Sequence, residues 1–118
     1  MSARCAVTCR KSPVTFTLKA MLFAVRFHDR TDCGNVRREY MQEHIAWLDE
    51  HRQTVLVGGS LRIEQGENPV GGLWLVEAPD KIAVEALISS DPFTILGLRE
   101  YYEIFFWSKA FPDRKVSV

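Results

Sequence analysis

The sequence predicts a single α+β domain with the element order strand, helix, strand, strand, helix, strand. Stretches with the two-residue apolar period of strands alternate with stretches that have the 3.6-residue period of helices. Glycine and proline fall between these stretches, where turns are needed. A chain of 118 residues also has the length of one domain. We expect the domain to occupy residues 21–118, and residues 1–20 to be a poorly ordered N-terminal extension, because the first periodic signal begins at Met21.

The first strand is predicted from Met21 to His28. Phe23, Val25 and Phe27 occupy alternate positions in it, and side chains two residues apart lie on the same face of a strand. We therefore expect these three residues to face the core. Residues 29–35 have the composition of a turn.

The first helix is predicted from about Val36 to His51, with Asp32 or Asn35 as its N-terminal cap. Successive helical residues are about 100° apart, and this spacing gives an apolar arc with His44 in its middle. The arc consists of Tyr40, Met41, Trp47 and Leu48. The charged residues of the helix are expected to be surface charges only, and they are Arg37, Arg38, Glu39, Glu43 and Glu50.

The second half of the domain repeats the alternation. A second strand is predicted from Thr54 to Ser60 and a third from Gly71 to Glu77, antiparallel to each other across a hairpin loop. A second helix follows from Pro79 to Ser89, and a fourth strand from Tyr101 to Trp107. The apolar stripe expected on the second helix is Ile82, Ala83, Ala86 and Leu87. This order is the split βαβ, or ferredoxin-like, arrangement, an antiparallel sheet with both helices on one face.

Two of the predicted strands are apolar on both faces. Residues 73–76 read Leu-Trp-Leu-Val and residues 104–107 read Ile-Phe-Phe-Trp. Helices cover only one face of this sheet, and a soluble monomer rarely exposes an apolar patch of that size. We therefore predict a homodimer in which two sheets pack face to face as a dimeric α/β barrel. The alternative is that Trp74 or Trp107 lies under the C-terminal tail.

Composition narrows the classes of partner. The chain has 15 basic and 15 acidic residues, so it carries no excess charge for binding nucleic acid or an anionic membrane. No apolar run approaches the roughly 20 residues that span a bilayer. The cysteines, Cys5, Cys9 and Cys33, form neither a disulfide framework nor a metal-binding pattern, so we expect no metal and a reducing cytoplasm.

One pair of residues is suited to acid–base chemistry. Pro92 pushes Asp91 out of the helical conformation, so Asp91 is expected at a turn that directs its side chain. His44 faces the interior from the first helix, and the two helices lie side by side in this fold. A carboxylate that accepts from Nδ1–H of His44 would leave Nε2 as a base. A satisfied core histidine and an aspartate that caps a helix are the alternative interpretation of the same residues.

From Met21 onward the sequence resembles the YciI-like (YCII-related) family, which belongs to the dimeric α/β-barrel group. The residues that carry the resemblance are Met21–Phe23, Glu43–Leu48, Val57–Gly59, Ser90–Phe93, and Tyr101, Tyr102 and Ile104. The resemblance implies a ferredoxin-like protomer, a homodimer, and an active site built on His44 and Asp91. Members resemble muconolactone isomerase in fold, and one lineage removes chloride from a chlorinated hydroxyhydroquinone. This chain departs from many relatives in having Gly59-Ser60 in place of Gly-Pro.

These observations together predict a cofactor-independent lyase or isomerase that acts on a small cyclic or aromatic compound. His44 would be the general acid or base and Asp91 its orienting partner, while Arg26 and Ser60 would bind an anionic or hydroxyl group of the ligand. The alternative is a non-catalytic dimeric ligand-binding or interaction module, in which His44 and Asp91 form a structural pair. A haem- or metal-using protein of the same fold would lack a convincing ligand set here.

Overall fold

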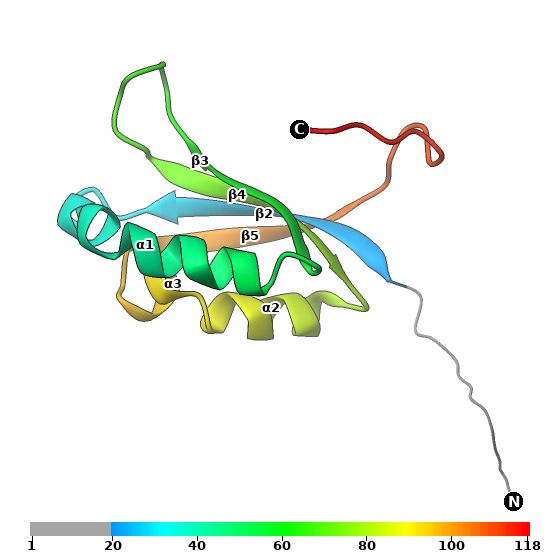
Figure 1. The fold of residues 1–118 in the computed structure, drawn as a ribbon, viewed down its shortest axis with the longest axis horizontal. Helices are drawn as coiled ribbons and strands as arrows, with labels where there is room; N and C mark the ends of the chain where they lie inside the picture. The colour runs from blue at the N-terminus through cyan, green and yellow to red at the C-terminus, as the bar shows by residue number, and fades with distance from the viewer. Residues whose placement is uncertain (1–19) are drawn as a thin grey trace, which may run out of the picture.

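The computed structural model describes residues 20–118 and contains an antiparallel sheet of four strands with three helices on one face (Figure 1). The strands lie in the order β3-β4-β2-β5, and this is the predicted ferredoxin-like α+β fold. The bounds are Met21–Asp29 for β2, Val55–Leu61 for β3, Gly71–Ala78 for β4 and Arg99–Trp107 for β5. The predicted N-terminal extension lies outside the described residues, except for Ala20.

The core lies between the sheet and the helices. Phe23, Val25 and Phe27 of β2 are buried there, as their alternation predicts, and Trp74 and Val76 of β4 are buried beside them. Direct partners across a sheet point to the same face. The register pairs Phe23 with Val76 and Val25 with Trp74, so the two central strands build one apolar layer under the helices.

Helix α1 runs from Gly34 to Glu50 and follows Cys33, whose side chain makes no capping hydrogen bond. The predicted caps, Asp32 and Asn35, are therefore wrong. Tyr40 departs from helical geometry, with φ −114° and ψ 16°, so α1 is kinked there.

Arg37 of α1 was predicted to be a surface charge, and this prediction is wrong because Arg37 is buried. It is 9% exposed, and its Nη2 lies 2.6 Å from Oδ2 of Asp29. The helical spacing explains the position, since Arg37 comes about 100° after Val36 and therefore only about 20° from His44. The apolar face of the helix thus also carries this cation.

Helix α2 runs from Lys81 to Ser89 and is capped by Asp80, whose Oδ1 accepts from the backbone N–H of Ala83 at 2.9 Å. Its buried residues are Val84 and Ile88, whereas Ile82 of the predicted stripe is 75% exposed. Ala83 and Leu87 of the predicted stripe do pack against the core, whereas Ile82 and Ala86 are exposed, so the stripe is only partly right. Apolar residues occur nearly all round this helix, so periodicity alone does not select the buried face.

A short helix, α3, runs from Pro92 to Ile95 where the sequence predicts only a turn. Proline is favoured in the first turn of a helix, because its missing N–H would have no partner there. Gly97 follows with φ 82°, a conformation that glycine adopts readily. Strand β5 then begins at Arg99, two residues before the predicted start, and this places Arg99 at the end of the sheet near Asp29.

The other face of the sheet carries no helix (Figure 1), and part of it is apolar. Val57, Leu75, Ala24 and Phe105 form one row across all four strands. Together with Val118 of the C-terminal tail they line a hollow of about 480 Å³. Trp74 lies on the helix-covered face instead, and Trp107 remains 42% exposed beside the tail. The homodimer stays a prediction.

No helix within residues 20–118 has the length and apolar character required to cross a bilayer.

Candidate active site

The structure brings His44 and Asp91 into contact. Nδ1 of His44 lies 2.8 Å from Oδ1 of Asp91, and the two side chains come from the middle of α1 and from the residue before α3. An ionised carboxylate can only accept a hydrogen bond, so Nδ1–H donates and Nε2 is left without a proton in the neutral ring. His44 is 7% exposed and Asp91 is fully buried.

Local structure holds each partner in place. Asp91 has the extended backbone that a following proline imposes, and its carbonyl accepts from the N–H groups of Thr94 and Ile95 in the first turn of α3. The imidazole of His44 stacks on the ring of Phe93, with 4.1 Å between ring centroids and 16° between planes. Phe93 is itself fully buried, so the packing restricts rotation of the imidazole.

The His44–Asp91 pair is one end of a chain of buried ion pairs. Oδ2 of Asp91 lies 3.3 Å from Nη2 of Arg99, and Nη1 of Arg99 lies 3.3 Å from Oδ1 of Asp29. The other oxygen of Asp29 accepts from Arg37. Four elements therefore supply the chain that runs from Arg37 through Asp29, Arg99 and Asp91 to His44.

This chain determines the charge state of its carboxylate. Burial alone would raise the pKa of Asp91, but the hydrogen bond from His44 and the charge of Arg99 outweigh burial and lower the pKa below its ordinary value. Burial lowers the pKa of the Arg99 guanidinium, while Asp91 and Asp29 act in the opposite direction. Asp91 is therefore an anion at neutral pH, as an orienting partner for an imidazole must be.

A cavity of about 180 Å³ adjoins His44 between α1 and the sheet. Its walls include Met41, Leu48 and Trp74, and Arg37 and Arg99 also reach it. Nε2 of His44 has no hydrogen-bond partner within residues 20–118, and it is not among the fully buried atoms of that region that lack one. This nitrogen is therefore not fully buried, and His44 is one of the residues that line the cavity.

Glycines keep the cavity open. A Cβ atom added to Gly58 would lie 3.2 Å from Cδ1 of Trp74, and one added to Gly72 would lie 3.5 Å from Nη1 of Arg99. Either side chain would project between the sheet and α1. A cavity of roughly 150 Å³ lined by apolar residues is known to hold benzene, so this space suits a single ring.

The other predicted ligand-binding residues lie apart from each other. Ser60 lines the cavity at its rim, and its hydroxyl accepts from Nη1 of Arg62 at 2.7 Å. Arg26 does not share the cavity, because its position in β2 places it on the face that carries no helix, opposite to His44. The polar side chains that the structure adds to the site are Asp29, Arg37 and Arg99. Within residues 20–118, no three His, Cys, Asp or Glu side chains come together as metal ligands would.

Comparison with known proteins identifies the family. The model of the YCII-related domain matches residues 21–108, which confirms the resemblance on which the sequence prediction rests. No curated protein sequence matches the chain significantly.

Several solved structures are similar to this one, including the two that follow. The first is 5-chloro-2-hydroxyhydroquinone dehydrochlorinase from Burkholderia phenoliruptrix in complex with 2,5-dihydroxybenzoquinone, with 28% identity and a TM-score of 0.68. The match covers 75% of this chain and 94% of the dehydrochlorinase. The second, from Bacteroides thetaiotaomicron, is assigned by name to the antibiotic biosynthesis monooxygenases, with 18% identity and a TM-score of 0.52 over 84% of this chain and 97% of that protein. At that identity it shows the fold alone.

Proposed function

This chain belongs to the YCII-related family, and from that premise we propose that it is a lyase or isomerase acting on a small cyclic or aromatic compound without a cofactor. The observation that carries the proposal is the state of His44, which lines a cavity and whose Nδ1 is held by a buried carboxylate while Nε2 has no partner among residues 20–118. The likeness to a dehydrochlorinase crystallised with a dihydroxybenzoquinone supports a ligand of this class. The unit that performs the reaction is residues 21–118.

In this proposal His44 is the general base and Asp91 its orienting partner. Nε2 takes a proton from the ligand, and the carboxylate stabilises the imidazolium that forms. In an elimination of hydrogen chloride, the electron pair left by that proton forms a new π bond, and chloride leaves with its bonding pair. In an isomerisation, His44 returns the proton to another atom of the ring. Ser60 at the rim is placed to bind a hydroxyl group.

A direct test uses the compounds that the dehydrochlorinase is named for and crystallised with. Release of chloride from 5-chloro-2-hydroxyhydroquinone is measured for the wild type and for His44→Ala. Binding of 2,5-dihydroxybenzoquinone is followed by the intrinsic tryptophan fluorescence, to which Trp74 in the cavity wall contributes. We expect chloride release by the wild type and a large loss in the variant. Equal turnover in both proteins would show that His44 is not the general base.

The alternative is a non-catalytic binding module in which the His44–Asp91 pair is structural. The buried ion pairs that continue from Asp91 to Arg37 favour a structural contribution. An open Nε2 favours catalysis, because a structural histidine has both nitrogens satisfied by protein. Ligand binding without turnover in the wild type, across chlorinated and unchlorinated ring compounds, would select the module.

We further propose that the working form is a homodimer in the cytoplasm. The row formed by Val57, Leu75, Ala24 and Phe105 makes a continuous apolar strip on the open face of the sheet. A second copy of the chain covers this face in the proposed assembly, since each copy presents the same strip and an isologous dimer is closed.

A further inference from the structure

We propose that Arg99 is a positioning residue for the His44–Asp91 pair, and that the charges of Arg99 and Asp29 set how readily His44 takes up a proton. The proposal rests on the proposed function only where it calls the pair catalytic. The coupling of charges concerns the free protein and needs no substrate.

Arg99 is held in one geometry. Its side chain is 4% exposed, and its two terminal nitrogens face two carboxylates, Asp91 and Asp29. The guanidinium lies over the ring of Phe27, with 4.0 Å from its central carbon to the ring centroid, and 5.3 Å from that of Phe93. Its Nε is buried without a partner within residues 20–118. A planar fork between two acids and over an aromatic ring suits arginine better than lysine.

Arg99 also selects which oxygen of Asp91 serves His44. Oδ2 of Asp91 is occupied by Nη2 of Arg99 at 3.3 Å and by the hydroxyl of Thr94 at 3.3 Å. Oδ1 is thereby left for Nδ1 of His44. If Arg99 were removed, Oδ2 of Asp91 would keep the hydrogen bond from Thr94 but lose its charged partner, so the carboxylate that orients the imidazole would be held less firmly.

The charges of the chain cancel when the imidazole is neutral. Arg37 and Arg99 contribute two positive charges, and Asp29 and Asp91 contribute two negative charges. A proton on His44 therefore leaves one uncompensated positive charge in a largely buried cluster. Loss of the Arg99 cation should make that proton easier to bind, whereas loss of the Asp29 anion should make it harder to bind.

The experiment measures the pH titration of the His44 Cε1–H signal by NMR in the full chain without substrate. Compared with the wild type, Arg99→Met is expected to move the titration midpoint up by about one pH unit, and Asp29→Asn to move it down by a similar amount. Arg99→Lys keeps the positive charge, so its titration midpoint should lie close to that of the wild type. Lysine lacks the planar fork of arginine, so it should not hold the Asp91 carboxylate in the same orientation. Arg52→Met, which removes an exposed arginine paired with Asp49, is the control variant.

Opposite shifts support the proposal, because a purely structural role would change both variants in the same way. Shifts of the same sign, or none beyond that of Arg52→Met, would overturn it. If Arg99→Met does not fold, Asp29→Asn and Arg37→Gln supply the two signs, with a smaller upward shift expected for Arg37→Gln at the far end of the chain. Failure here would leave the proposed reaction intact. If the titrations shift as expected but the wild type turns over no substrate, the proposed reaction is wrong and the coupling of charges still holds.

Discussion

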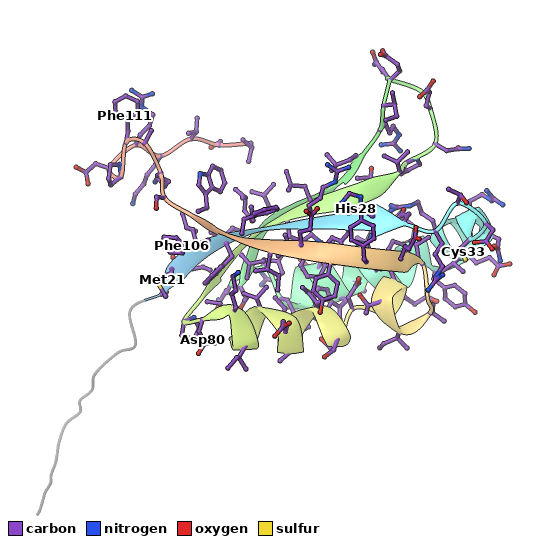
Figure 2. All side chains as sticks on the ribbon, turned by 180° about the vertical axis from the view of Figure 1, so that it is seen from behind. Met21, His28, Cys33, Asp80, Phe106 and Phe111 are labelled. Carbon is purple, nitrogen blue, oxygen red and sulfur yellow. The ribbon has the colours of Figure 1, made fainter. Side chains whose placement is uncertain are left out.

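Asp29 and Arg99 form an ion pair at the end of the sheet although 70 residues separate them in the sequence. The β2–β5 register shifts between His28 and Asp29. Before the shift His28 lies opposite Tyr101, so an unbroken ladder would place Asp29 opposite Glu100 and bring two carboxylates together. The irregularity replaces that repulsion by an attraction and connects Asp29 to the chain that ends at His44. Figure 2 shows His28 at this end of β2, with Cys33 beyond it and Phe106 toward the opposite end of the sheet.

Removal of the imidazole should abolish most of the proposed activity without unfolding the protein. General acid–base catalysis is worth about 10²–10⁴ in rate, so His44→Ala should lose at least about 100-fold in kcat with an accepted substrate. The matched control is His51→Ala, since His51 lies at the end of α1 and donates through Nδ1 to the carbonyl of Trp47. Steady-state kinetics and far-UV circular dichroism check the two expectations. A variant of His44 with full kcat would contradict the assigned role.

Asp91→Asn should lower the free energy of unfolding by about 3 kcal/mol, because it removes one partner from buried ion pairs and leaves Arg99 undercompensated. Urea denaturation measures this loss. Asp49→Asn is the control, since Asp49 pairs with Arg52 on the exposed surface, and a change within about 0.5 kcal/mol is expected there.

The same pair should also make stability depend on pH. The pKa of Asp91 is lowered in the folded state, so its contribution is complete above the unfolded-state pKa of about 3.9 and is lost as the pH falls through the lower folded-state pKa. The contribution of the Asp91 carboxylate to the stability difference between the wild type and Asp91→Asn should therefore shrink as the pH falls below about 4. A difference that grows as the pH falls below about 4 would mean that the folded-state pKa of Asp91 is raised instead.

The fold could be predicted from the sequence because strand β2 and helix α1 have a clear period and turn residues separate most of the other elements. The contact between His44 and Asp91 follows from a helix face and a proline-defined turn. The buried position of Arg37 could also have been predicted, since the spacing that places His44 on the apolar face places Arg37 beside it. The position of Arg99 could not be predicted. Its contact with Asp29 depends on a register shift, and adjacent charges of opposite sign at Arg99 and Glu100 give no indication of which one faces inward.

Because Gly72 helps to keep the cavity open, a side chain added there should weaken ligand binding selectively. In Gly72→Ala the new methyl group would lie 3.5 Å from Nη1 of Arg99 and 3.1 Å from the carbonyl oxygen of Gly59, so it narrows the cavity and presses on its wall. In Gly59→Ala the methyl group meets nothing within 4 Å. We expect the affinity for 2,5-dihydroxybenzoquinone, measured by fluorescence titration, to fall about 10-fold or more in Gly72→Ala, roughly the effect of one misfitting methyl group. Gly59→Ala should bind as the wild type does, and equal affinities in all three proteins would place the ligand elsewhere.

If the proposed homodimer forms through the helix-free face of the sheet, a charged residue introduced on that face should dissociate it. Phe105 is 51% exposed at the β5 end of the apolar strip, so Phe105→Glu would place a carboxylate in the proposed dimer interface, where it has no partner. Sedimentation equilibrium should give twice the monomer mass of 13.5 kDa for the wild type and the monomer mass for the variant. Ile82→Glu is the matched control, because Ile82 is 75% exposed on α2, away from that face. A dimer that survives Phe105→Glu but dissociates in Ile82→Glu would move the interface to the helices, since the same charge would then be tolerated on the sheet and not on α2.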